Sequence, residues 1–94
     1  MKAARAEAAL RLEDIPNIGP SIADDLRAID IFEPMQLRGQ DPYELYARSN
    51  AVNGAVQDPC LCDTFIAAVR FMEGGPVRPW WYYTPERKAK IGQR

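Results

Sequence analysis

Apolar residues recur at helical spacing along most of this chain, which predicts an all-α protein. The most regular stripe follows Asp58 and Pro59, with successive spacings of four, three, one and three residues. Its members are Leu61, Phe65, Ala68, Val69 and Met72. We expect this helix to lie at the centre of the core and to end at Gly74. Strand-like runs are absent apart from the aromatic residues 80–83, so no sheet is predicted.

The same periodicity divides the rest of the chain into further short helices. An opening helix is expected over residues 3–15 and a second helix over residues 20–30. Residues 34–39 predict a single turn, and residues 42–51 predict a longer helix that is followed by a loop. The sequence therefore predicts a single domain over residues 1–94, with about five short helices.

Two of these helices have the same start signal. Asp41-Pro42 and Asp58-Pro59 each place a capping carboxylate before a proline at the first helical position. Glu44 follows Asp41 by three residues and completes a variant of the capping box. We therefore expect both helices to begin at these prolines.

Composition and the N-terminus limit the class of protein. The chain has 94 residues, of which 47% are hydrophobic and 27% charged, the balance of one compact domain. No run approaches the roughly 20 apolar residues of a bilayer span, so the sequence does not predict a membrane protein. Lys2, Arg5 and Glu7 interrupt the region where an export signal needs an apolar stretch, so a cytoplasmic location is expected.

Few side chains suit catalysis or metal binding. The sequence contains no histidine and only two cysteines, Cys60 and Cys62, so a four-ligand zinc site within one chain is excluded. A disulfide between residues two apart would be strained, so we expect two thiols, at least one of them buried. No nucleotide loop and no Ser-His-Asp set is present. We therefore expect a non-catalytic binding module with no metal and no cofactor.

Charge is distributed unevenly along the chain. Residues 1–58 hold six basic and ten acidic side chains, whereas residues 59–94 hold six basic and three acidic ones. The positive charge gathers in the last twenty residues. Two interpretations stay open: an anionic partner, or a solvated and frayed terminus.

Residues 12–26 resemble the helix-hairpin-helix motif, in which a tight apolar turn joins two short helices. Six residues fall in register with the motif: Leu12, Ile15, Ile18, Gly19, Ala23 and Leu26. Asn17 stands where the motif has its first glycine, which is tolerable because asparagine adopts positive φ more readily than most residues with a Cβ. The resemblance implies a hairpin over residues 8–30 of a SAM-like or helix-hairpin-helix domain.

The resemblance implies sequence-independent contact with duplex DNA, weak and non-specific, because the amides and helix dipole of such a turn favour a phosphate. The residues carried over to this chain are Asn17, Ile18, Gly19, Pro20, Ser21 and Arg27. Members of the motif commonly carry cations just after the turn, where this chain has Asp24 and Asp25. These carboxylates would compete with a phosphate. A protein-interaction scaffold that binds no nucleic acid therefore stays open as the alternative.

A wider resemblance covers nearly all of residues 12–88. The order of the hairpin, the Asp58-Pro59-Cys60 helix start and the Pro79-Trp80-Trp81 segment looks like small bacterial proteins of a pathogenicity-locus or mitomycin-resistance-type family. That name is a genetic label, so the resemblance implies a fold and little chemistry. The resulting division of the chain is a hairpin at 8–30, a helical remainder at 34–74, and an aromatic and basic tail at 76–94.

The tail is the second candidate surface, with four adjacent aromatic residues followed by basic ones. This pattern suits stacking on unpaired bases, and it equally suits a hot spot for a protein partner. A third interpretation is that Trp80 or Trp81, with one tyrosine, folds back across the core helix. The candidate contact residues are Trp80, Trp81, Tyr83, Arg87 and Lys88.

Overall fold

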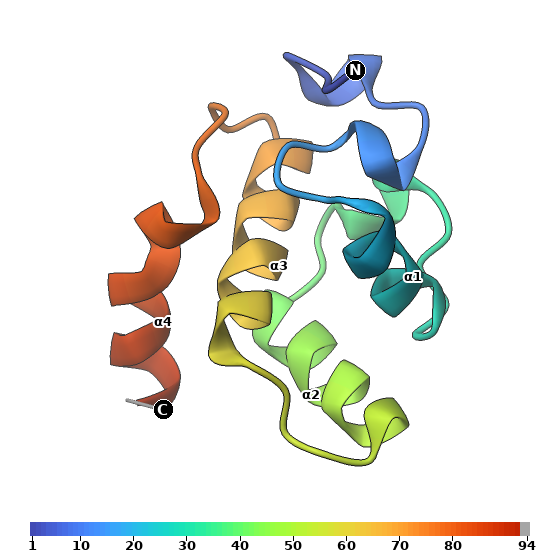
Figure 1. The fold of residues 1–94 in the computed structure, drawn as a ribbon. Helices are drawn as coiled ribbons and strands as arrows, with labels where there is room; N and C mark the ends of the chain where they lie inside the picture. The colour runs from blue at the N-terminus through green and yellow to red at the C-terminus, as the bar shows by residue number, and fades with distance from the viewer. Residues whose placement is uncertain (93–94) are drawn as a thin grey trace.

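The computed structural model describes residues 1–92, which form helices and connecting turns (Figure 1). The described residues contain no strand, and this confirms the all-α class. The four α-helices are α1 (Pro20–Arg27), α2 (Pro42–Asn53), α3 (Pro59–Met72) and α4 (Thr84–Ile91). The four short 3₁₀ helices are η1 (Ala6–Ala8), η2 (Leu12–Asp14), η3 (Pro34–Leu37) and η4 (Trp80–Tyr83).

Helix α3 lies at the centre of the domain, as predicted. In Figure 1 it stands between α4 on one side and α1 on the other, and α2, η3 and η4 also pack against it. Phe65, Ile66 and Met72 are fully buried. Ile66 lies outside the predicted stripe, because a helix that is covered on several sides buries more than one face.

The predicted opening helix over residues 3–15 is wrong. This segment forms η1 and η2, which are separated by extended backbone at Ala9 and Arg11. The Asp14 carboxylate accepts hydrogen bonds from the backbone amides of Leu10 and Arg11, at 3.1 and 3.0 Å. Because this side chain satisfies amides that a helix would pair with carbonyls, the chain makes separate turns here.

Helix α1 begins at Pro20 as predicted and ends at Arg27, short of the expected Asp30. Asp30 adopts a φ of 70°, and the Ile31 amide donates to the Leu26 carbonyl at 3.0 Å, so the chain reverses there. The turn and the second helix of the resemblance are present, but the first helix is reduced to η2. The complete helix-hairpin-helix motif is therefore not confirmed.

Helices α2 and α3 begin at the predicted prolines. The Asp41 carboxylate accepts a hydrogen bond from the Tyr43 amide, and Asp58 accepts one from Cys60, both at 2.9 Å. These contacts confirm the two aspartates as caps. Helix α2 runs two residues beyond its expected end and stops at Gly54, whose φ of 75° suits glycine.

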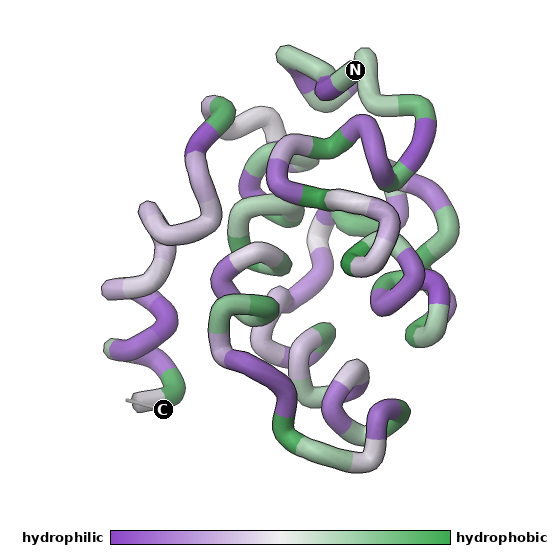
Figure 2. Tube along the Cα trace, viewed as in Figure 1, coloured by the Kyte–Doolittle hydropathy of each residue, from purple (hydrophilic) through white to green (hydrophobic). Residues whose placement is uncertain are grey.

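The tail folds back along α3 as η4 and α4, so residues expected to be an extension become part of the domain (Figure 1). Figure 2 shows that α4 is mostly hydrophilic, whereas α3 is largely hydrophobic. Only Arg87 of α4 is buried among the described residues. The last two residues of the predicted tail, 93–94, lie outside the described part. Within that part, no helix is long and apolar enough to span a bilayer.

Candidate nucleic-acid interface

Residues 15–19 form the tight turn that precedes α1. The Ile18 amide donates to the Ile15 carbonyl at 3.1 Å, and both side chains are fully buried. Asn17 adopts a φ of 74°, the left-handed conformation that the first glycine of the motif would supply. Gly19 caps α1, and its carbonyl accepts the first helical hydrogen bond from Ala23 at 2.9 Å.

Three backbone amides at the start of α1, those of Gly19, Ser21 and Ile22, have no acceptor among the described residues. Pro20 follows Gly19 and has no N–H to offer. Ser21 is exposed, and no atom from another part of the chain lies within 4 Å of the place where a Cβ on Gly19 would stand. Because the first turn of a helix carries partial positive charge, this position suits an anion.

The fold brings a cation to this turn from a distant part of the sequence. The Lys2 ammonium donates hydrogen bonds to the carbonyls of Glu13, at 2.7 Å, and of Ile18. The neighbouring Ala3 amide donates to the Asp14 carbonyl at 2.7 Å, which fixes the N-terminal segment against η2. No spacing in the sequence marks Lys2, because its contact depends on the N-terminal segment folding back.

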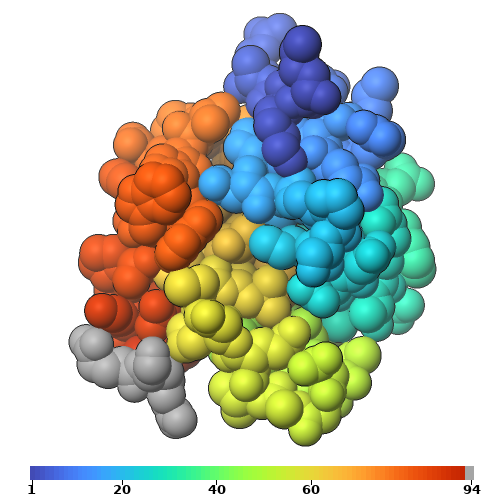
Figure 3. Space-filling model, in the orientation of Figure 1, coloured from blue at the N-terminus to red at the C-terminus, as the bar shows by residue number. Residues whose placement is uncertain are grey.

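Asn17 connects the turn to the tail. Its side-chain Nδ2 donates to the backbone carbonyl of Arg78 at 2.8 Å, and the Arg78 guanidinium lies 4.2 Å from the ring centre of Tyr82. In Figure 3 the tail (orange) and the hairpin (blue and cyan) share one face, with the start of α3 (yellow) between them. Two surfaces that the sequence suggests separately therefore adjoin in the fold.

Arg27, a predicted nucleic-acid contact, is occupied by carboxylates instead. Its guanidinium donates to both Glu13 oxygens, at 3.0 and 2.9 Å, and to Asp24 at 3.0 Å. The hydrogen bond from Arg27 holds the pKa of Glu13 below its ordinary value. Arg27 therefore joins η2 to α1 and partly offsets the charge of Asp24.

Two of the predicted tail contacts are buried. Tyr83 is 6% exposed, which confirms that one tyrosine folds back on the core helix. Arg87 is 4% exposed, and its Nε donates to Asp63 Oδ1 at 2.9 Å. The Thr84 hydroxyl donates to the other oxygen of Asp63 at 2.6 Å. Arg87 thus lies between α4 and α3 and not on the surface where it was expected.

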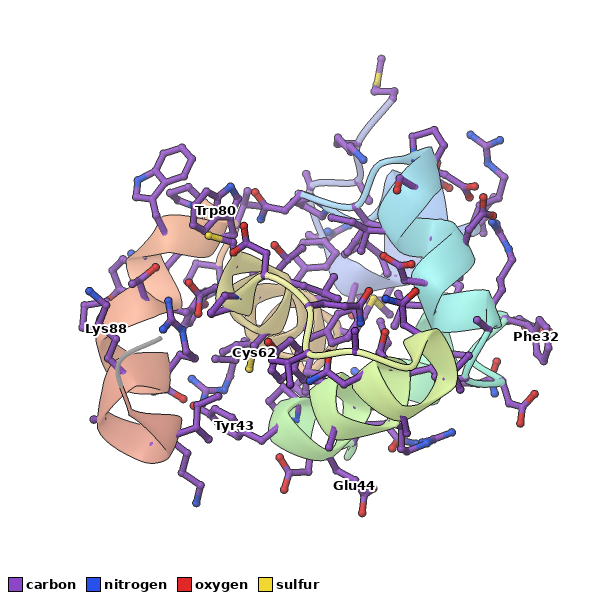
Figure 4. All side chains as sticks on the ribbon, turned by 60° about the horizontal axis from the view of Figure 1, so that its bottom comes forward. Phe32, Tyr43, Glu44, Cys62, Trp80 and Lys88 are labelled. Carbon is purple, nitrogen blue, oxygen red and sulfur yellow. The ribbon has the colours of Figure 1, made fainter. Side chains whose placement is uncertain are left out.

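The remaining tail candidates are at least partly accessible. Trp81 is 62% exposed and stands perpendicular to the half-buried Trp80, with ring centres 5.4 Å apart. Lys88 lies on the outer side of α4 (Figure 4). Tyr82, which the sequence did not single out, is 54% exposed. The Tyr82 ring packs perpendicular to the ring of the buried Tyr83, with ring centres 5.1 Å apart.

Both cysteines are free thiols, as expected. Cys62 is fully buried, and burial raises its pKa to about 12. Burial also raises the pKa of Cys60. Both thiols therefore stay protonated near neutral pH and are poor nucleophiles. Within residues 1–92, no three potential metal ligands of the His, Cys, Asp and Glu types converge.

The fold defines a small all-α domain, and comparison with known proteins gives its family. The family description "Pathogenicity locus" (Cdd1) matches residues 5–89. The mitomycin resistance protein McrB of Streptomyces lavendulae is 52% identical over 80 residues, which cover 85% of this chain and 76% of that protein. This chain therefore belongs to the Pathogenicity locus family. No solved structure matches it.

Proposed function

We propose that this protein is a non-catalytic module that binds the nucleic-acid backbone through residues 17–21. The observation that carries the proposal is the group of amides without acceptors on Gly19, Ser21 and Ile22, at a turn that also holds the Lys2 ammonium. Amides and an ammonium bind phosphate oxygens and do not read bases, so the contact is independent of sequence. The expected ligand is duplex DNA.

The surrounding charges set the expected strength of this contact. Arg78 adds a second cation on the segment that Asn17 holds beside the turn. Asp24 and Asp25 follow in the second turn of α1 and oppose a phosphate, and the whole chain has a net charge of −1. We therefore expect weak binding that depends on a few local contacts and not on a broad positive field.

An amide-resolved NMR titration with a short DNA duplex tests the proposal. At about 50 mM salt we expect shifts centred on Ile18, Gly19 and Ser21. At about 200 mM salt the affinity should fall roughly tenfold if two phosphates are contacted. The absence of shifts at the lower salt concentration would overturn the proposal.

Gly19 offers a matched pair of variants. Its φ of −90° and the empty space around it allow a longer side chain without distortion of the turn. Gly19→Glu places a carboxylate beside the amides and should weaken DNA binding more than the neutral Gly19→Gln of similar size. Lys2→Gln should weaken binding and lower the salt slope by about one. Equal affinity of the wild type and Gly19→Glu would contradict the proposal.

A protein-interaction surface is the second candidate function. It is favoured by the exposure of three large apolar side chains around η4, namely Val77 at 54%, Trp81 at 62% and Tyr82 at 54%. Contact through such a surface would depend little on salt, unlike contact through phosphates. If the duplex produces no shifts, protein interaction through this surface is the function that the molecule supports.

A further inference from the structure

A groove of about 420 Å³ opens between α1, the start of α3 and η4, beside the turn described above (Figure 3). Ile22 and Leu61 give it an apolar lining, and Trp80 adds an aromatic ring. The volume lies within the range of small-molecule sites, and the groove is open to solvent. The groove is therefore large enough to hold a ligand with an apolar body.

Two carboxylates line the same groove, those of Asp25 and Asp58, and none of the described residues that line it is basic. Asp25 is half-buried and makes no hydrogen bond or ion pair with a described residue. Loss of solvent around this carboxylate raises its pKa, with a smaller contribution from Asp24. A cation in the groove would offset that cost.

Asp58 keeps its negative charge in this groove. Its carboxylate caps α3 by accepting the Cys60 amide at 2.9 Å, and this hydrogen bond holds the pKa of Asp58 below its ordinary value. The groove therefore presents a permanent anion as well as the partly desolvated Asp25. Asn17 adds a side-chain oxygen, since its nitrogen is already used on the Arg78 carbonyl.

These features select among cations. A guanidinium group is planar, carries five N–H donors and stacks on an indole ring, whereas an ammonium group is compact and strongly hydrated. The arginine stem also has methylene groups that can pack on apolar side chains such as Ile22 and Leu61. Carboxylates, an aromatic ring and an apolar lining together fit arginine better than lysine.

We propose that this groove binds an arginine side chain presented by a partner polypeptide. The guanidinium pairs with Asp25 and stacks on Trp80, while the stem packs on Ile22 and Leu61. Charge complementarity carries the choice of occupant, because the groove is acidic and its walls offer acceptors and an aromatic face. This inference goes beyond the proposed function, since it requires no nucleic acid.

An NMR titration with the blocked peptide acetyl-Gly-Arg-Gly-amide tests the inference. We expect saturable shifts at Ile22, Asp25 and Leu61 and at the indole N–H of Trp80. The same peptide with citrulline in place of arginine keeps the shape and removes the charge, and it should bind about tenfold more weakly. Equal affinity for the two peptides, or no shifts with millimolar arginine peptide, would overturn the inference.

Two neighbouring carboxylates provide matched variants. Asp25→Asn should weaken binding of the arginine peptide about tenfold, the loss of one charge-assisted contact. Asp24→Asn removes the same charge from a side chain that is 78% exposed and paired with Arg27, and it should change the affinity less than about twofold. Equal effects of both variants would show that the arginine peptide is attracted by negative charge in general, and they would overturn the inference of a specific site.

Failure of this inference can be distinguished from failure of the proposed function. Lys2→Gln lies outside the groove, so it should weaken DNA binding and leave the affinity for the arginine peptide unchanged. Asp25→Asn should weaken binding of the arginine peptide and leave DNA binding unchanged or stronger, because it removes a carboxylate that opposes a phosphate. Loss of peptide binding in Lys2→Gln would contradict a separate groove.

Discussion

At the scale of single residues, Asn17 combines two structural roles. It supplies the positive φ of the turn, and its side chain fixes the backbone of Arg78, 61 residues further along the chain. The first role could be predicted, because it depends on the intrinsic preference of asparagine and on its place in a local motif. The second could not, because it depends on where the tail lies in the folded domain.

Two substitutions separate these roles. Asn17→Gly keeps the positive φ and loses only the hydrogen bond to Arg78, so it should lower the free energy of unfolding by about 1 kcal/mol. Asn17→Ala also strains the turn and should cost roughly 1–2 kcal/mol more. Urea unfolding of the three proteins measures both differences. Equal stability of the glycine and alanine variants would show that the turn relaxes to another conformation.

At the scale of elements, local signals predicted where α2 and α3 begin. They gave the wrong structure for the first segment of the chain and did not predict α4. Asp41 and Asp58 mark helix starts because their capping contacts reach only two residues ahead. The prediction of an opening helix was wrong because the Asp14 side chain competes for the backbone amides of its own segment. Helix α4 has no apolar stripe, so its place against α3 depends on the buried pair of Asp63 and Arg87, which no periodicity reveals.

The pair of Asp63 and Arg87 offers a test of how α4 is held. Asp63→Ala leaves the Arg87 guanidinium buried without its partner and should lower the free energy of unfolding by about 3–5 kcal/mol. Urea unfolding measures the loss, and NMR shifts show whether α4 detaches from α3.

The Arg70–Glu86 pair is the matched control, because both side chains are about 40% exposed. Glu86→Gln should cost less than about 1 kcal/mol, since solvent screens an exposed pair. If both variants lost the same stability, the buried pair would have no special part in holding α4.

At the scale of the whole molecule, the fold assembles the candidate site from three distant parts of the chain. The turn at residues 17–19 is local and its conformation could be predicted, whereas Lys2 and Arg78 reach it through contacts that only the complete fold makes. The groove beside it likewise joins α1, α3 and η4. Local sequence patterns therefore predict the turn, but they do not predict the charges and the groove around it.

The distribution of carboxylates predicts how the stability of the whole domain depends on pH. Hydrogen bonds from Arg27 and from backbone amides lower the pKa values of Glu13, Asp14 and Asp58 below their ordinary 4.5, 3.8 and 3.8. Because these values are lower in the folded state, the stabilisation is present above the unfolded pKa values and is lost as pH falls through the folded ones. Asp25 acts in the opposite sense, since burial raises its pKa.

Because three carboxylates have lowered pKa values and one has a raised pKa value, we expect a net loss of stability in acid. The free energy of unfolding in urea should be nearly constant from about pH 7 to about pH 6 and should fall between about pH 5 and about pH 3. Asp58→Asn keeps an effective cap on α3 and removes one of the titrating groups, so its loss in acid should be smaller than that of the wild type. An equally steep loss in this variant would mean that the acid sensitivity arises from carboxylates other than the one that caps the central helix.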